Sequence, residues 1–217
     1  MNPDDPHKDE PILYEGCNLD SAKSAFIMLH GRGGSAVDFL SVGHYLAPQQ
    51  TALIAPQAAE DSWYPYSFLA PLKQNQPWLN SAMRKIAECL AECLKADIPT
   101  ERVAIIGFSQ GACLATAFAA SNLARYGALI AFTGALPGPL GTSLDHQGDL
   151  AGTPVLLSSG DPDLHVPWQR VEETEKALSR MGAIVQLLRH RNRPHTILNS
   201  ELLAARRLLI ASALIDG

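Results

Sequence analysis

Short apolar runs alternate with longer stretches of helical periodicity along this chain. The runs are near-continuous rather than interleaved with polar residues, and they occupy residues 25–29, 52–55, 103–106, 128–132, 154–157 and 184–188. Such runs are typical of strands buried on both faces of a mainly parallel sheet. Between them, residues of one helical face recur at spacings of three and four, as in Leu79, Met83, Ile86, Leu90 and Leu94 and in Val171, Thr174, Leu178 and Met181. The pattern predicts an α/β fold, a three-layer sandwich with a mainly parallel central sheet, and residues 12–14 are a candidate antiparallel strand.

The stretch from residue 57 to 77 lacks helical periodicity and is rich in aromatic residues and proline. We expect an ordered loop at a strand end, because long loops in that position commonly shape a substrate pocket. Trp63 and Tyr64 are therefore candidate pocket residues. The alternative is that Trp63 and Trp78 simply cover the core.

Composition narrows the class of protein. The 217 residues suffice for one domain with a single core, which we place at residues 12–217. Residues 1–11 are polar, acidic and proline-containing, so we expect a flexible leader there and no signal peptide. The net charge of −5 offers no positive field to nucleic acid, and no apolar run approaches the roughly 20 residues that span a bilayer. The expectation is a cytoplasmic protein.

The four cysteines are too few and too scattered to staple a chain that builds its own core, so free thiols are expected. Cys89 and Cys93 share a helix face, but no further cysteine or histidine lies at ligand spacing nearby. We therefore expect no bound metal.

Ser109 is the residue on which the functional interpretation depends. It is the centre of Gly-Phe-Ser-Gln-Gly, residues 107–111, between the apolar run 103–106 and an alanine-rich helical stretch. A strand, a sharp turn and a helix form a nucleophile elbow, in which the residues two positions before and after the serine must be small. Both are glycine here, and the amide of Gln110 at the helix N-terminus is expected to point at an oxyanion. The motif indicates acyl transfer through Ser109.

A serine hydroxyl needs a base to take its proton and an acid to orient that base. In this topology the order along the chain is serine, acid, histidine, with each partner on a loop after a later strand. The loop after the fifth run contains Asp161 and Asp163, and spacing leaves both open as the acid. His195, on the loop after the last run, is the predicted base. The other histidines fail on position, and His30 is expected to brace the loop after the first long strand; the rest are His7, His44, His146, His165 and His190.

These pieces together resemble the phospholipase/carboxylesterase family of α/β hydrolases, which includes the acyl-protein thioesterases. The resemblance covers nearly the whole chain. It rests on Leu-His-Gly-Arg-Gly-Gly at 29–34, Trp-Tyr-Pro at 63–65, the elbow at 107–111, Gly-Asp-Pro-Asp-Leu-His-Val-Pro at 160–167 and Pro-His-Thr-Ile at 194–197. It implies Ser109 as the nucleophile, His195 as base and then acid, and Asp163 as the residue that orients the histidine.

The family pattern also separates the two aspartates and supplies the second oxyanion donor. It selects Asp163, which leaves Asp161 as a turn residue that bonds its own loop. It further implies the backbone amide of Arg32, next to that of Gln110, as an oxyanion-hole donor. Three arginines bracket the predicted base; they either lie on a solvated loop or meet an anionic acyl carrier or head group, and they are Arg189, Arg191 and Arg193.

The predicted activity is hydrolysis of a small-molecule carboxylic ester or thioester through an acyl-Ser109 intermediate, without metal or organic cofactor. Ala112-Cys113 after the elbow, Ala-Leu-Pro-Gly at 135–138 and Arg193-Pro194 depart from the eukaryotic thioesterase pattern. These departures resemble the bacterial carboxylesterase branch, for which small esters or lysophospholipids are plausible substrates. Three alternatives remain: a lysophospholipase or acyl-protein thioesterase, a dienelactone-hydrolase-like lactonase, which would be expected to use a cysteine nucleophile, and a non-catalytic binding module on the same fold.

Overall fold

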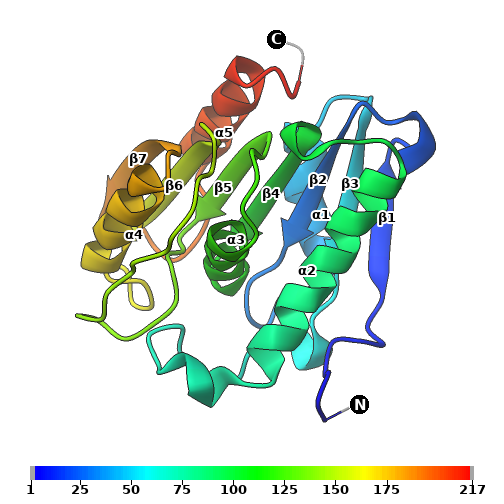
Figure 1. The fold of residues 1–217 in the computed structure, drawn as a ribbon. Helices are drawn as coiled ribbons and strands as arrows, with labels where there is room; N and C mark the ends of the chain where they lie inside the picture. Colours follow the sequence, from blue (N-terminus) through cyan, green and yellow to red (C-terminus); the bar gives the residue numbers. More distant parts are fainter. Residues whose placement is uncertain (1–2, 216–217) are drawn as a thin grey trace.

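A seven-stranded sheet forms the middle layer of the computed structural model, which describes residues 3–215 (Figure 1). The strand order is β1-β3-β2-β4-β5-β6-β7, and every neighbouring pair is parallel except β1 and β3. The strands are β1 (Ile12–Gly16), β2 (Ser24–Leu29), β3 (Thr51–Pro56), β4 (Val103–Phe108), β5 (Ala128–Phe132), β6 (Pro154–Asp161) and β7 (Ile184–Arg191). The mainly parallel sheet and its antiparallel first strand are both as predicted.

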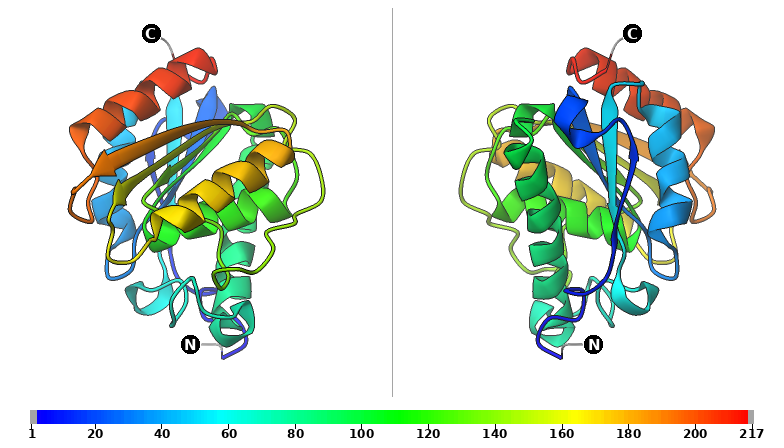
Figure 2. Two further views of the ribbon diagram at one scale, coloured as in Figure 1. Left: turned by 90° about the vertical axis from the view of Figure 1, so that its left-hand side faces the viewer. Right: turned by 90° about the vertical axis from the view of Figure 1, so that its right-hand side faces the viewer.

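Five α-helices cover the two faces of the sheet. Helices α1 (Ala36–Leu46) and α5 (Asn199–Ala211) pack on one face, and α2 (Trp78–Lys95), α3 (Gln110–Ser121) and α4 (Trp168–Arg180) pack on the other (Figure 2). Short 3₁₀ helices occur at Leu19–Ser21, Ala59–Asp61, Leu72–Asn75 and Thr100–Arg102. The three-layer sandwich is therefore confirmed, and both helices predicted from periodicity lie where expected.

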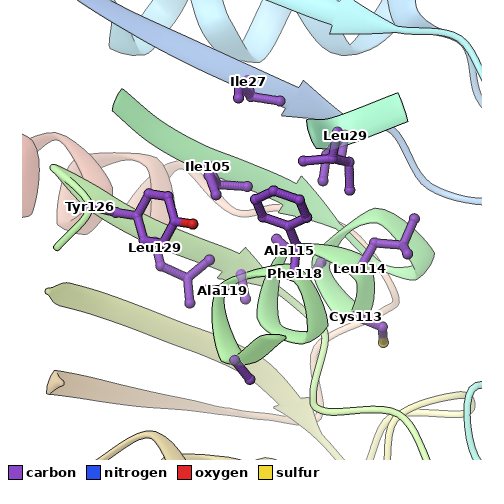
Figure 3. Close-up of a cluster of buried hydrophobic side chains, with 14 of the residues drawn as sticks. Ile27, Leu29, Ile105, Cys113, Leu114, Ala115, Phe118, Ala119, Tyr126 and Leu129 are labelled. Carbon is purple, nitrogen blue, oxygen red and sulfur yellow. The ribbon is translucent and has the colours of Figure 1, made fainter. Parts of the chain in front are cut away.

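The central strands bury alternate side chains in two separate cores. On the face under α3, Ile27, Leu29, Ile105 and Leu129 pack with Phe118 of the helix (Figure 3). The intervening residues of the same strands enter the opposite core with α1 and α5, and they include Phe26, Met28, Ala104, Ile106 and Ile130. Because both faces are covered, these strands have apolar residues at nearly every position, which explains the continuous runs in the sequence.

Strand β7 departs from the prediction of burial on both faces. It is an edge strand, its exposure alternates, and the Ile184 side chain is 69% exposed. One edge has no neighbouring strand and only part of the strand is covered by helices, so burial on both faces is wrong here.

The predicted flexible leader also needs correction for residues 3–11, while residues 1 and 2 lie outside the described part of the chain. The His7 side chain is fully buried, and its backbone N–H donates to Ser81 Oγ at 2.9 Å. Asp5 accepts a hydrogen bond from the same serine and is paired with Arg84. This polar segment packs because α2 offers it complementary polar partners, which apolar periodicity does not reveal.

The cysteines, the possible metal ligands and the helices were each compared with the predictions from the sequence. Cys17, Cys89, Cys93 and Cys113 are free thiols, as expected. Among residues 3–215, no three His, Cys, Asp or Glu side chains are grouped in a way that could hold a metal ion. None of the helices in that range combines the length and apolar character needed to span a bilayer.

Candidate active site

Ser109 stands on the sharp turn between β4 and α3. Its backbone has φ 53° and ψ −117°, a conformation that side-chain-bearing residues rarely adopt. The turn is held by hydrogen bonds from Ser109 N–H to the Phe132 carbonyl at 2.9 Å and from Cys113 N–H to the Ser109 carbonyl at 3.0 Å. A Cβ on Gly107 would lie 2.4 Å from the Gly111 backbone, so the elbow closes only with glycine there.

Ser109, His195 and Asp163 form a continuous hydrogen-bonded chain. Ser109 Oγ lies 2.8 Å from His195 Nε2, and His195 Nδ1 lies 2.9 Å from Asp163 Oδ2. The loops that carry these residues follow β4, β7 and β6, whose carboxyl ends meet at one edge of the parallel sheet. The structure therefore brings together the three residues that were predicted from positions far apart in the sequence.

The Asp163 carboxylate fixes which ring nitrogen carries the proton. Burial alone would raise the pKa of Asp163, but bonds from the His165 backbone N–H, the His195 ring and the Val166 N–H outweigh it and hold the pKa below its usual value. An ionised carboxylate only accepts hydrogen bonds, so Nδ1 of His195 must donate. In the neutral ring, Nε2 then accepts the Ser109 proton.

Asp161 takes no part in this chain. It ends β6, and its carboxylate accepts from Arg189 Nε at 2.6 Å and pairs with the Arg189 guanidinium. The same guanidinium stacks 5.0 Å from the Trp168 ring centre. The expected turn role of Asp161 is therefore replaced by a cross-strand ion pair with β7.

The three bracketing arginines do not share one environment. Arg189 is half-exposed in its ion pair, whereas Arg193 is buried. Arg193 donates to the Thr196 carbonyl and the Thr133 hydroxyl, both at 2.5 Å, and pairs with the buried Glu201 at 3.2 Å. The solvated-loop interpretation is thus wrong for Arg193, which anchors the loop that carries His195. Sequence reasoning missed this role because a loop arginine usually extends into solvent.

Two backbone N–H groups next to Ser109 are available to a ligand. Gln110 is the first residue of α3, where N–H groups lack intrahelical partners. The Arg32 N–H donates to no backbone carbonyl within the described residues. Both residues line the same cleft as Ser109. Their role as oxyanion donors stays a prediction, which the family resemblance made for Arg32 and the elbow motif for Gln110.

The side chains of these two residues have a separate task that the sequence did not reveal. Arg32 donates to the carbonyls of Tyr64, Pro65 and Tyr66, each at 2.8 Å. The Gln110 amide accepts from Trp63 N–H and donates to the Tyr64 carbonyl, also at 2.8 Å. Together they bond the stretch of residues 57–77, which we call the aromatic loop, to the floor of the cleft.

The cleft above Ser109 has a volume of about 630 Å³. Its walls are largely apolar, with His195 among the lining residues. The other lining residues include Tyr64, Phe68, Leu69, Leu164 and Val166. Tyr64 is therefore a lining residue, but Trp63 is not. Trp63 is fully buried behind the cleft, and its Nε1 donates to the His30 carbonyl at 2.8 Å, so the alternative of a core residue applies to it.

His30 supports the loop that contains Arg32. Its Nε2 accepts from Ala58 N–H at 3.1 Å, and its Nδ1 lies 2.8 Å from the Gly31 carbonyl. Burial lowers the pKa of His30, which favours the neutral ring that these two bonds require. The predicted bracing role of His30 is consistent with this geometry.

The arrangement has a defined chemical capacity. A neutral imidazole that accepts the proton of a serine hydroxyl, and is itself oriented by a carboxylate, converts the hydroxyl into a nucleophile. Unpaired N–H groups next to that hydroxyl can stabilise the negative charge of a tetrahedral intermediate. No other cluster of nucleophile, base and acid with these bonds occurs among residues 3–215.

Comparison with known proteins gives a consistent result. The family model described as Phospholipase/Carboxylesterase matches residues 16–212. A solved structure of a phospholipase/carboxylesterase from Dyadobacter fermentans is 42% identical, covers 93% of this chain and 97% of its own, and superposes with a TM-score of 0.89. The acyl-protein thioesterase 1 of Eremothecium gossypii is 29% identical over 73% of this chain and 74% of its own length. That of Yarrowia lipolytica is 24% identical over 72% and 70%, respectively.

Proposed function

Because the chain belongs to the phospholipase/carboxylesterase family of α/β hydrolases and is a hydrolase, we propose that it cleaves carboxylic esters or thioesters through an acyl-Ser109 intermediate. The observation that supports this most directly is the unbroken chain of hydrogen bonds from Ser109 Oγ through His195 to Asp163. A non-catalytic binding module does not fit a chain of this family.

The geometry supports the following first half-reaction. His195 Nε2 takes the hydroxyl proton as Ser109 Oγ attacks the substrate carbonyl, and the carbonyl oxygen becomes an oxyanion. The backbone N–H groups of Arg32 and Gln110 stabilise that charge, and Asp163 stabilises the imidazolium. His195 then donates its proton to the departing alcohol or thiol, which leaves the acyl group on Ser109.

The second half-reaction repeats these steps with water. His195 takes a proton from water as the water oxygen attacks the acyl-Ser109 carbonyl, and the same two N–H groups hold the second oxyanion. The acid is released when the proton returns to Ser109 Oγ. All proton transfers involve one ring, so neither a metal nor an organic cofactor enters the proposed cycle.

The cleft favours an apolar acyl or alcohol group. Phe68, Leu69 and Leu164 line it together with Ser109, and Leu164 is 93% exposed. An open apolar wall of this kind suits small esters and lysophospholipids, as proposed for the bacterial carboxylesterase branch. The acyl-protein thioesterases among the relatives support a thioester as the second candidate substrate.

A burst assay with p-nitrophenyl esters of increasing acyl length tests the proposal. Wild type should release a rapid burst of p-nitrophenol equal to the enzyme concentration, followed by steady turnover. Ser109→Ala should show no burst and lose labelling by a fluorophosphonate probe. The acyl length with the highest kcat/KM separates a short-chain esterase from a lipid or thioester hydrolase. Equal turnover in wild type and Ser109→Ala would contradict the proposal.

A further inference from the structure

His7 lies behind the active site, on a segment that precedes the family match at residues 16–212. Figure 2 shows this N-terminal segment beside the start of α2. It is fastened there by bonds from Ser81 to Asp5 and from the Lys85 ammonium to the Lys8 carbonyl at 3.2 Å. The His7 ring packs edge-on against Trp63 of the aromatic loop and Trp78, the first residue of α2, with ring centres 5.4 Å apart in both pairs.

Both ring nitrogens of His7 bond the backbone of the aromatic loop. Nδ1 accepts from Ala59 N–H at 3.0 Å, and Nε2 lies 3.0 Å from the Trp63 carbonyl, to which it donates. Burial lowers the pKa of His7 and so favours the neutral ring, which has one donor and one acceptor. The ring therefore clamps residues 59 and 63 at a fixed separation.

The turn at residues 59–63, which His7 bonds at both ends, contains two backbone conformations that are unfavourable without support from neighbouring groups. Glu60 and Asp61 are consecutive non-glycine residues with φ of 50° and 53°. Left-handed conformations of such residues are unfavourable and persist only where surrounding contacts impose them. The two bonds of His7 flank this strained pair: Ala59 directly precedes it, and Trp63 follows it by two residues.

The same turn bonds the two segments that carry the predicted oxyanion donors, the loop with Arg32 and the start of α3 with Gln110. The Asp61 carbonyl accepts from Gly33 N–H at 2.7 Å, and the residue before Gly33 is Arg32, which lines the cleft. Trp63 N–H donates to the Gln110 side chain, and Trp63 Nε1 donates to the His30 carbonyl. A shift of the turn would therefore displace both oxyanion donors in relation to Ser109.

We infer that His7 is a positioning residue of the hydrolase, which holds the 59–63 turn where both oxyanion N–H groups meet the tetrahedral intermediate. This inference rests on the proposed function. His7 touches neither the cleft nor Ser109, so its effect is exerted through Asp61 and Trp63. Because the oxyanion forms only after substrate binds, the loss of this positioning should lower kcat rather than raise KM.

Three replacements of His7 test the inference with p-nitrophenyl esters. His7→Phe keeps a ring but removes both bonds, and kcat should fall by about 10- to 100-fold with KM within about threefold of wild type. His7→Asn can retain the acceptor for Ala59, and His7→Gln can retain the donor to Trp63. Both should lie between wild type and His7→Phe. Arg84→Ala, which loosens the segment without touching the ring, is the control and should keep kcat within about threefold.

Hydrogen exchange supplies a readout that does not need activity. In folded His7→Phe, amides of peptides that span residues 30–34 and 107–111 should exchange faster than in wild type, while those of β5 should not. Unchanged kcat together with unchanged exchange would overturn the inference, as would a rise in KM alone. If wild type were not labelled at Ser109, the proposed function would fail by itself, and the exchange result would still decide the role of His7. Should His7→Phe not fold, His7→Asn and His7→Gln provide the same comparison.

Discussion

Asp161 and Asp163 stand two residues apart, yet their carboxylates meet different partners. Asp163 holds the His195 ring at 2.9 Å, and Asp161 binds Arg189 on the neighbouring strand. We predict that Asp163→Asn lowers kcat/KM by about 10⁴, because an amide can donate to Nδ1 and stabilise the wrong tautomer. Steady-state kinetics checks this, with Asp161→Asn as the matched control.

The control should lose less than about threefold in kcat/KM, because a partly exposed ion pair contributes little and lies outside the hydrogen-bonded chain. A collapse of activity in Asp161→Asn with normal activity in Asp163→Asn would exchange the two assignments. Spacing in the sequence left this choice open, and it was the family pattern that pointed to Asp163.

Single residues were predictable where chemistry restricts their type and unpredictable where packing decides their role. Ser109 and His195 were found because a nucleophile elbow and a fixed order of residues leave few candidates. Arg193 was misjudged, since only the fold brings the buried Glu201 of α5 against it. Trp63 was open between pocket and core, and a neighbour far away in sequence, His30, resolves its position.

At the scale of elements, the approach of β4, α3 and β2 depends on the absence of a side chain at Gly111. A Cβ there would lie 2.1 Å from the Leu29 carbonyl of β2, against rigid backbone. We predict that Gly111→Ala lowers the free energy of unfolding by about 3 kcal/mol or more, because α3 must move away from the sheet. Urea unfolding measures this change.

Gly152→Ala is a matched control for that measurement. Gly152 has φ of 76°, and no atom lies within 4 Å of the point that a Cβ would occupy, so alanine meets backbone strain alone. It should lower the free energy of unfolding by about 1 to 2 kcal/mol. An equal loss in the two variants would show that the close packing of the elbow contributes nothing beyond conformational strain.

Strands that helices cover on both faces could be predicted from the pattern of apolar residues. The position of a strand at the edge of the sheet, and a segment held by polar contacts, could not. The runs of β2, β4 and β5 reflect burial in two cores, so their prediction needed no knowledge of neighbours. Strand β7 has the same apolar character at the edge of the sheet, where half of its side chains face outward. Sequence composition does not show which strand becomes the edge.

At the scale of the whole molecule, the sequence predicted the three layers and the residues that the candidate site brings together. It did not predict that the N-terminal segment packs against α2 and the aromatic loop. Residues 3–11 lack apolar periodicity, and what holds them is a set of polar bonds to α2 and the aromatic loop. Polar partners that are distant in sequence leave no periodic signal. The wrong prediction of a flexible segment at residues 3–11 therefore has the same origin as the wrong prediction of a solvated Arg193.

Buried neutral histidines make the stability of the whole fold depend on pH in a defined window. Burial lowers the pKa of both His7 and His30 below the value of about 6.5 that an unfolded chain has. Below that pH the unfolded state binds more protons, so the free energy of unfolding should fall as pH drops, by at most about 1.4 kcal/mol per pH unit for each histidine. Carboxylates with lowered pKa, such as Asp5 and Asp163, add a loss of the same sign only below about pH 4.

Urea unfolding of wild type and His7→Gln at pH 8, 7, 6 and 5.5 separates this contribution. Wild type should change little between pH 8 and 7 and then lose stability toward pH 5.5, because the histidine window opens near pH 6.5. The loss should be smaller in His7→Gln, since glutamine has no proton to gain and the neutral His30 alone remains of the pair. Equal losses in the two proteins would mean that His7 is protonated to the same extent in the folded and unfolded states, which its two bonds to Ala59 and Trp63 do not allow.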